Sequence, residues 1–267
     1  MSKTILITGA GSGLGKGAAF ELAKQGHRVI ATTHGAEDAE TLKAEAAELG
    51  LTLETAKLDI TSAEDRQAAF DRFGAEVDIV VANAAIGDTG PIAEVDVDRI
   101  RAVFETNVFS TVEFVQPYAQ AFASRGRGKV VFVSSIAGFL TFPYLAPYTA
   151  SKHALEAIAE LMREELEPMG VQVATINPGA YRTGFNDRMY DKMDEWYDPA
   201  RSITPPEAIR KVRDLFAGDS LQMDPQPMID KMAEVIAADH HKFRTVFPEE
   251  AIQAVLDYQQ KHWSLEI

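Results

Sequence analysis

Short apolar runs alternate along the chain with longer segments whose apolar residues recur at helical spacing. The runs are typical of strands buried on both faces of a sheet, and the longer segments of helices with one buried face. Strands are expected at residues 5–8, 29–32, 51–58, 77–82, 129–135, 171–176 and 243–247. A helix is expected directly after the first strand, and others at 40–49, 62–73, 92–124 (interrupted near Gln116 and Pro117), 147–169, 205–216, 228–238 and 248–261.

Strands that alternate with helices predict an α/β fold. The expected architecture is a doubly wound, Rossmann-like parallel sheet of about seven strands with helices on both faces. The length of 267 residues suits a single domain over 1–267.

A glycine-rich turn, Gly9-Ala10-Gly11-Ser12-Gly13-Leu14-Gly15, joins the first strand to its helix. Such glycines let the chain turn tightly and let the backbone approach a phosphate, which the helix N-terminus then faces with free N–H groups. The turn does not match a Walker A loop, because positions 10 and 17 are Ala and Gly. It does not match Gly-x-Gly-x-x-Gly either, because positions 14 and 16 are Leu and Lys. Nucleotide binding is the favoured interpretation over a purely structural turn, since the context is strand, turn, helix and strand.

The end of the second strand predicts which nicotinamide cofactor binds. An acidic residue there favours NAD, while basic or neutral groups tolerate the 2′-phosphate of NADP. Here Thr33 and His34 stand at the turn, and the nearest acids, Glu37 and Asp38, are expected to start the next helix. This pattern favours NADP over NAD, although His34 could also be a surface loop residue.

Tyr148 and Lys152 lie four residues apart in a predicted helix, so both side chains can point into one cleft. A free tyrosine has a pKa of about 10, and a nearby ammonium favours its phenolate. The pair is therefore a candidate proton donor and acceptor, and we expect the pKa of Tyr148 to be lowered. Alone, such a pair is more often an ordinary feature of a helix surface.

Polar residues follow several expected strands: Asp59, Asn83, Ser135 and the segment Asn177-Pro178-Gly179. In a doubly wound sheet, ligands bind at the carboxyl ends of the strands. Each of these residues could singly be only a turn residue, so their joint placement carries the argument.

With these motifs in order, the sequence resembles the short-chain dehydrogenase/reductase family in its compact, single-domain form. The resemblance spans residues 4 to about 184 and rests on Thr8-Gly9, Gly13-x-Gly15, Asp59, Asn83-Ala84, Asn107, Ser135, Tyr148-x-x-x-Lys152, Pro178-Gly179 and Thr183. Two departures stand out. Ala85 occupies a position where the family commonly has Gly, and Ser12 one where many NADP-preferring members carry Lys or Arg.

The resemblance implies four catalytic residues. Tyr148 would be the general acid/base, Lys152 would bind the nicotinamide ribose and lower the tyrosine pKa, Ser135 would bond the substrate oxygen, and Asn107 would order a water in the proton relay. The implied cofactor site comprises Gly9, Ser12, Gly13, Leu14, Gly15, Thr33, His34, Asp59, Ile60, Asn83, Ala84, Tyr148, Lys152, Pro178, Gly179 and Thr183.

The expected substrate pocket is largely apolar and is formed by Ile86, Phe139, Tyr144, Tyr181, Phe185 and Met189. The resemblance also implies a variable region within the domain at residues 184–240, where family members place a mobile substrate lid. A helical segment that only packs on the core is the alternative for 184–204.

Composition and charge argue against several classes of function and of site. The net charge of −14 argues against binding to nucleic acid or to an anionic membrane surface. The absence of cysteine excludes disulfides, a thiolate nucleophile and a Cys-based zinc site. Adjacent His240 and His241 point apart and lack a third ligand, so no metal is expected. No apolar run suits a signal peptide or a membrane span, and a cytoplasmic protein is expected.

These observations predict an NAD(P)-dependent oxidoreductase that interconverts a secondary alcohol and a carbonyl on a largely apolar small molecule. The resemblance also implies a homodimer or homotetramer. Two alternatives remain open. One is a cofactor-sensing regulator without turnover, and the other is an enzyme similar to sugar-nucleotide epimerases or dehydratases, which share Tyr-x-x-x-Lys.

Overall fold

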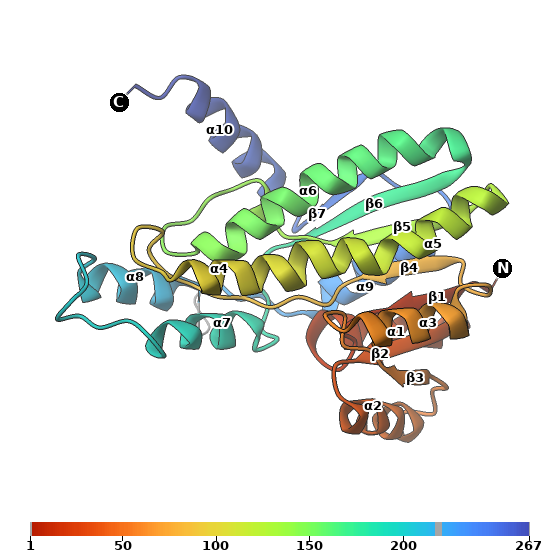
Figure 1. Ribbon diagram of the computed structural model, residues 1–267. Coiled ribbons are helices and arrows are strands. Elements are labelled where there is room, and N and C mark those ends of the chain that lie inside the picture. Colours follow the sequence, from red (N-terminus) through yellow and green to blue (C-terminus); the bar gives the residue numbers. More distant parts are fainter. Residues whose placement is uncertain (1, 217–220, 267) are drawn as a thin grey trace.

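A computed structural model describes residues 2–216 and 221–266. In this part of the chain, seven parallel strands form one sheet, in the order β3-β2-β1-β4-β5-β6-β7 (Figure 1). The strands are β1 (Thr4–Ile7), β2 (Arg28–Thr33), β3 (Glu54–Lys57), β4 (Ile79–Ala82), β5 (Gly128–Val133), β6 (Val171–Pro178) and β7 (Arg244–Phe247). The predicted doubly wound sheet is confirmed. The bounds of most strands differ by a few residues from the predicted ones, but the strands follow one another along the chain as predicted.

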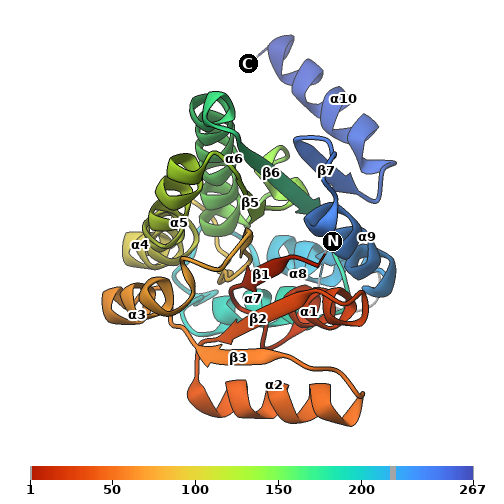
Figure 2. The same cartoon turned by 90° about the vertical axis from the view of Figure 1, so that its right-hand side faces the viewer.

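Helices cover both faces of the sheet. They are α1 (Gly13–Lys24), α2 (Ala36–Glu48), α3 (Ala63–Phe73), α4 (Val97–Phe104), α5 (Thr111–Arg125), α6 (Ala146–Leu166), α7 (Phe185–Asp194), α8 (Pro206–Phe216), α9 (Gln226–Ala237) and α10 (Ala251–Trp263). Side chains of α1, α2 and α9 share a core with Ile5 and Ile7. Those of α3, α5 and α6 share another with Leu6, because successive strand residues point to opposite faces. Figure 2 shows α1 and α9 on one side of the sheet and α3, α5 and α6 on the other.

The expected break near Pro117 is not observed, since α5 runs continuously through that residue. The irregular turn lies earlier, in a π-helical segment, η1 (Glu105–Ser110). There the side chain of Asn107 donates to the carbonyl of Ile86 at 2.9 Å and accepts from its N–H at 2.9 Å. A side chain that bonds a neighbouring loop holds the wider turn open, which a helical period alone does not reveal.

The strand order reverses between β1 and β4, which lie side by side at the centre of the sheet. In doubly wound folds the crevice at this point, outside the carboxyl ends of the strands, is where ligands bind. Helices α7 and α8 lie beyond that end (Figure 1). They belong to the predicted variable region 184–240, of which residues 217–220 lie outside the described part of the chain.

Candidate active site

A cavity of about 680 Å³ lies along the carboxyl ends of the strands. All sixteen residues predicted for the cofactor line it: Gly9, Ser12, Gly13, Leu14, Gly15, Thr33, His34, Asp59, Ile60, Asn83, Ala84, Tyr148, Lys152, Pro178, Gly179 and Thr183. Ser135 lines it too. The fold therefore gathers into one cavity residues that are far apart in the sequence.

The glycine turn borders the cavity, and it has no room for a side chain at Gly9 or Gly15. Gly9 has φ +65°, and a Cβ there would lie 2.7 Å from the Cα of Ala84. A Cβ on Gly15 would lie 2.4 Å from the side-chain nitrogen of Asn83. Ser12 precedes α1 without capping it through its side chain, so the first N–H groups of α1 stay available to an anion.

Asn83 ties the turn to the neighbouring strand. Its side-chain nitrogen donates to the carbonyls of Thr8 at 2.8 Å and Gly9 at 3.1 Å. In return, the hydroxyl of Thr8 accepts from the N–H groups of Asn83 and Ala84, both at 3.0 Å. These bonds fix the relative positions of the two loops that leave β1 and β4.

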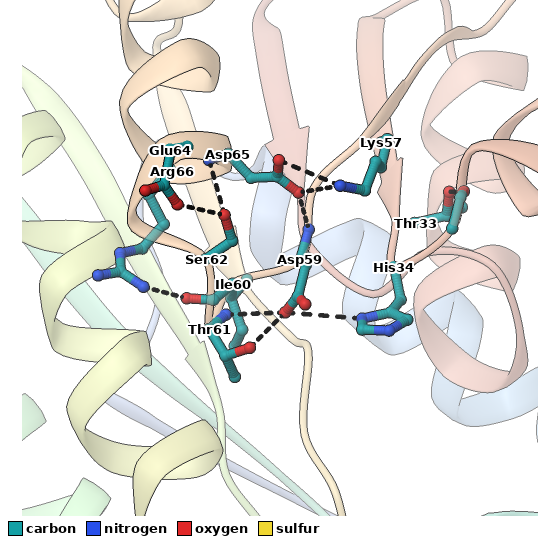
Figure 3. Close-up of polar contacts among 11 residues, drawn as sticks. Thr33, His34, Lys57, Asp59, Ile60, Thr61, Ser62, Glu64, Asp65 and Arg66 are labelled. Atoms are coloured by element: carbon teal, nitrogen blue, oxygen red, sulfur yellow. Dashed lines mark hydrogen bonds and ion pairs between the residues drawn. The ribbon is translucent and has the colours of Figure 1, made fainter.

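His34 and Asp59 face each other close to the glycine turn, where a Cβ on Gly11 would lie 3.3 Å from Cγ2 of Thr33 (Figure 3). The Nδ1 of His34 lies 3.6 Å from Oδ1 of Asp59, which also accepts from the N–H of Thr61 at 2.9 Å and from its hydroxyl at 2.7 Å. Burial alone would raise the pKa of Asp59, but the bonds from Thr61 and the charges of His34 and Lys57 hold it below its usual value. Asp38, expected only to start a helix, also lines the cavity.

Tyr148 and Lys152 project from the same face of α6 and are both buried. The Nζ of Lys152 donates to the carbonyl of Val133 at 2.9 Å and lies 5.6 Å from the centre of the Tyr148 ring. Ser135 follows β5, and its hydroxyl accepts from the N–H of Ala137 at 3.1 Å. A hydroxyl, a phenol and an amine thus line one wall of the cavity.

The predicted lowering of the tyrosine pKa is not observed. Burial raises the pKa of Tyr148 to about 12, and its hydrogen bond with Ser135 offsets only part of the rise. Burial likewise lowers the pKa of Lys152 to about 8. The expectation considered only the attraction between an ammonium and a phenolate, whereas loss of solvation disfavours the charged form of both groups.

Asn107 is buried beside the cavity but does not line it. Besides its two bonds to Ile86, its side chain donates to the hydroxyl of Ser151 on α6 at 3.0 Å. The amide therefore holds the loop after β4 against α6. Its implied role in a proton relay stays a prediction.

Four of the six predicted pocket residues line the cavity: Ile86, Tyr181, Phe185 and Met189. Phe139 does not, because its ring lies 5.3 Å beneath the guanidinium of Arg244. Tyr144 does not either. Its backbone adopts φ +64°, and its carbonyl accepts from the N–H of Gly90 at 2.8 Å.

Phe142, Leu145, Tyr190 and Phe216 also line the cavity. The sequence indicates the loop around Phe142 as an apolar wall and the aromatic segment around Tyr190 as a lid, but it does not single out Leu145 or Phe216. The ring of Phe216 lies 4.9 Å from that of Phe142 and 6.4 Å from that of Tyr190. The apolar stripes of α7 and α8 were the available signal, but only the packing shows that they face the cavity.

Comparison with known families decides the class of this chain. The profile of the short chain dehydrogenase family matches residues 3–194. The chain belongs to this family. It is therefore a short-chain dehydrogenase/reductase, an enzyme, as its resemblance had implied.

Its relatives are oxidoreductases. The uncharacterized oxidoreductase YusZ of Bacillus subtilis (strain 168) is 32% identical, with 95% of this chain and 97% of the relative covered. Retinol dehydrogenase 8 of Homo sapiens is 31% identical, with 91% and 80% covered. The solved structure of a short-chain dehydrogenase from Streptomyces avermitilis superposes with a TM-score of 0.81 at 26% identity, covering 98% of this chain and 94% of that one.

Two kinds of feature are absent from the described part of this dehydrogenase. Among residues 2–216 and 221–266, no cluster of three or more His, Cys, Asp or Glu side chains could hold a metal ion. Within the same residues, no helix combines the length and apolar character needed to cross a membrane.

Proposed function

We propose that this dehydrogenase uses NADP or NAD to interconvert a secondary alcohol and a carbonyl on a largely apolar small molecule, with Tyr148 as general acid/base. One observation carries the proposal: Tyr148, Lys152 and Ser135 line the same cavity as the glycine turn. A proton donor and a nucleotide-binding turn in one cavity fit transfer of a hydride with a proton.

The residues present fit a dinucleotide. The glycine turn and the uncapped start of α1 would receive its diphosphate, and Asp59 and Ile60 would border its adenine. Thr183 lies against Gly13, where a Cβ would be 3.3 Å from the threonine Cβ, so the segment after β6 reaches the turn. When bound, a nicotinamide supplies or accepts the hydride.

In the reductive direction, negative charge develops on the carbonyl oxygen. The hydroxyls of Ser135 and Tyr148 are the donors available to that oxygen, and such donors stabilise charge most where water is excluded. Tyr148 gives up its proton, and the ammonium of Lys152 then stabilises the phenolate that remains. Oxidation of an alcohol reverses these steps.

The pocket composition supports an apolar substrate. Phe142, Phe185, Met189 and Phe216 line the cavity on the side of α7 and α8. Purified protein incubated with NADPH or NADH and a panel of apolar ketones should oxidise the cofactor, as followed by the nicotinamide absorbance. Tight cofactor binding without turnover on any ketone would instead favour a cofactor-sensing regulator.

The cofactor proposal favours NADP, because Thr33 and His34 place no carboxylate directly at the end of β2. The substitution His34→Asp would add one, which accepts bonds from a ribose hydroxyl and repels a 2′-phosphate. We expect the ratio of kcat/KM for NADP to that for NAD to fall at least about tenfold, because placing two like charges together costs more than the roughly 1.4 kcal/mol that corresponds to a factor of ten. His240→Asp, a matched change in an exposed histidine outside the cavity, should leave the ratio unchanged.

We also propose a homodimer or homotetramer in the cytoplasm. Phe109 in η1 and Leu161 in α6 are exposed, on the segments that carry Asn107 and Tyr148. Large apolar side chains on adjoining elements are common where subunits meet. Light scattering of the purified protein should give at least twice the monomer mass, whereas a monomer would refute this part of the proposal.

A further inference from the structure

Behind the catalytic wall lies a buried carboxylate to which the proposed reaction gives no role. Glu156 stands on α6 one turn after Lys152, as Lys152 stands one turn after Tyr148. Its side chain is only 5% exposed. A carboxylate is costly to bury unless it is bonded and paired, so its surroundings indicate what holds it there.

Two residues on strands of the sheet donate hydrogen bonds to this carboxylate. Asn177 at the end of β6 donates to Oε1 of Glu156 at 2.5 Å, and Arg244 on β7 donates to Oε2 at 3.2 Å. The same nitrogen of Asn177 lies 3.4 Å from the carbonyl of Ser135. The network therefore joins the backbone of Ser135 to the helix that carries Tyr148 and Lys152.

The packing around the carboxylate leaves little freedom. Gly138, in the short helix η2 (Ile136–Gly138), lies so close that a Cβ there would be 2.8 Å from Cγ of Glu156 and 3.2 Å from the carbonyl of Lys152. Any side chain at Gly138 would push α6 away from the serine loop. The bonds from Asn177 and Arg244 and the packing against Gly138 thus hold the carboxylate in place one helical turn from Lys152.

Few other charges act on the Lys152 ammonium. On α6 it has Tyr148 on one side and Glu156 on the other, and β5 offers only the carbonyl of Val133. The segments η2 and β6 contribute no charged side chain here, and η1 faces α6 with the uncharged Asn107.

Helix α4 also packs against α6, but its charged side chains pair with other groups, Asp98 with Arg101 and Arg99 with Asp88. Glu105 of η1 is exposed and accepts from Ser110. Arg244 acts through Glu156, and it also pairs at the surface with Glu160 at 2.8 Å. Burial lowers the pKa of Lys152, and the charge of Glu156 is what opposes that fall.

We propose that Glu156 is a positioning residue of the active site, whose buried carboxylate keeps the Lys152 ammonium charged and, through Asn177, holds the Ser135 loop in place. The inference rests on the proposed function, because the charge of Lys152 matters only if Tyr148 becomes a phenolate. It adds a third member, one turn further along α6, to the Tyr148 and Lys152 pair.

The test is the pH dependence of kcat/KM for carbonyl reduction, measured on the full chain with saturating cofactor. In the unmodified enzyme, the rate should fall as pH rises through about 8, where Lys152 loses its charge. Glu156→Gln keeps the shape and the bond from Asn177 but removes the negative charge. It should move this limb to lower pH by about one unit, the usual effect of one close opposite charge.

A second variant predicts a shift of the opposite sign. Arg244→Met removes the cation that neutralises Glu156, so the limb should move to higher pH. The control Glu160→Gln changes the other partner of Arg244 at the surface and should leave the limb in place. A purely structural role would lower kcat in E156Q and R244M without moving this limb of the pH profile, or would shift the limb in the same direction in both variants. Either result overturns the inference.

A folding failure of E156Q and a failure of the proposed function can each be told apart from a failure of the inference. Should E156Q fail to fold, R244M decides alone: an upward shift supports the inference, and an unmoved limb overturns it. Failure of the proposed function itself would appear in another variant, because Tyr148→Phe would then retain its turnover.

Discussion

Tyr148→Phe is expected to lower kcat for carbonyl reduction by about 10³-fold, within the range that one general acid contributes. The variant keeps the ring, and with it the contacts to Phe185, 5.6 Å away, and to the Lys152 ammonium, also 5.6 Å away. Only the proton donor is lost. The dissociation constant of the cofactor, measured by fluorescence titration, should therefore change by no more than about twofold, because removing a group used only in the transition state leaves ground-state binding intact.

The matched control is Tyr118→Phe. The Tyr118 hydroxyl is buried in the core against α3 and has no hydrogen-bond partner among the described residues. Its removal should leave kcat unchanged and cost little or no stability, because no bond is broken. If Tyr148→Phe keeps more than about a tenth of the turnover, another group supplies the proton and the assignment is wrong.

Gly9→Ala is expected to weaken cofactor binding by about 100-fold, the cost of displacing a site by roughly 1 Å. Gly9 has φ +65°, and the added Cβ would lie 2.7 Å from the Cα of Ala84. The clash is with backbone, so the loop after β4 must shift, and Asn83 shifts with it. Binding of the cofactor measured by titration is the readout.

Gly50→Ala separates this clash from backbone strain. Gly50 has φ +71°, but nothing lies within 4 Å of a Cβ placed there. Both variants should lose about 1–2 kcal/mol of unfolding free energy from the left-handed backbone. Only Gly9→Ala should also lose cofactor affinity. Equal affinities in the two variants would show that the turn does not bind the cofactor.

The fold was largely predictable because it depends on local patterns. Continuous apolar runs predict the buried central strands, as at β4, and Gly9, Gly13 and Gly15 predict the turn after β1. A cap is equally local: Ser62 was expected to begin a helix, and its hydroxyl accepts from the N–H of Asp65 at 3.2 Å.

The wrong predictions concern features that depend on contacts between residues far apart in the sequence. The wide turn at Asn107 depends on Ile86, and the direction of the Phe139 ring depends on Arg244, more than a hundred positions later. Spacing placed Lys152 beside Tyr148 correctly, but the direction of their pKa shifts depends on burial by the whole fold. Glu156 gave no signal in the sequence, because its partners come from β6 and β7.

A crystal structure with bound cofactor and a ketone substrate tests the central claim most directly, through the distance from the Tyr148 hydroxyl to the substrate oxygen. We expect a hydrogen bond of about 2.6–3.2 Å, with the nicotinamide ring on the Thr183 side of the cavity. A substrate oxygen held by other donors, with the Tyr148 hydroxyl beyond hydrogen-bond reach, would contradict the account.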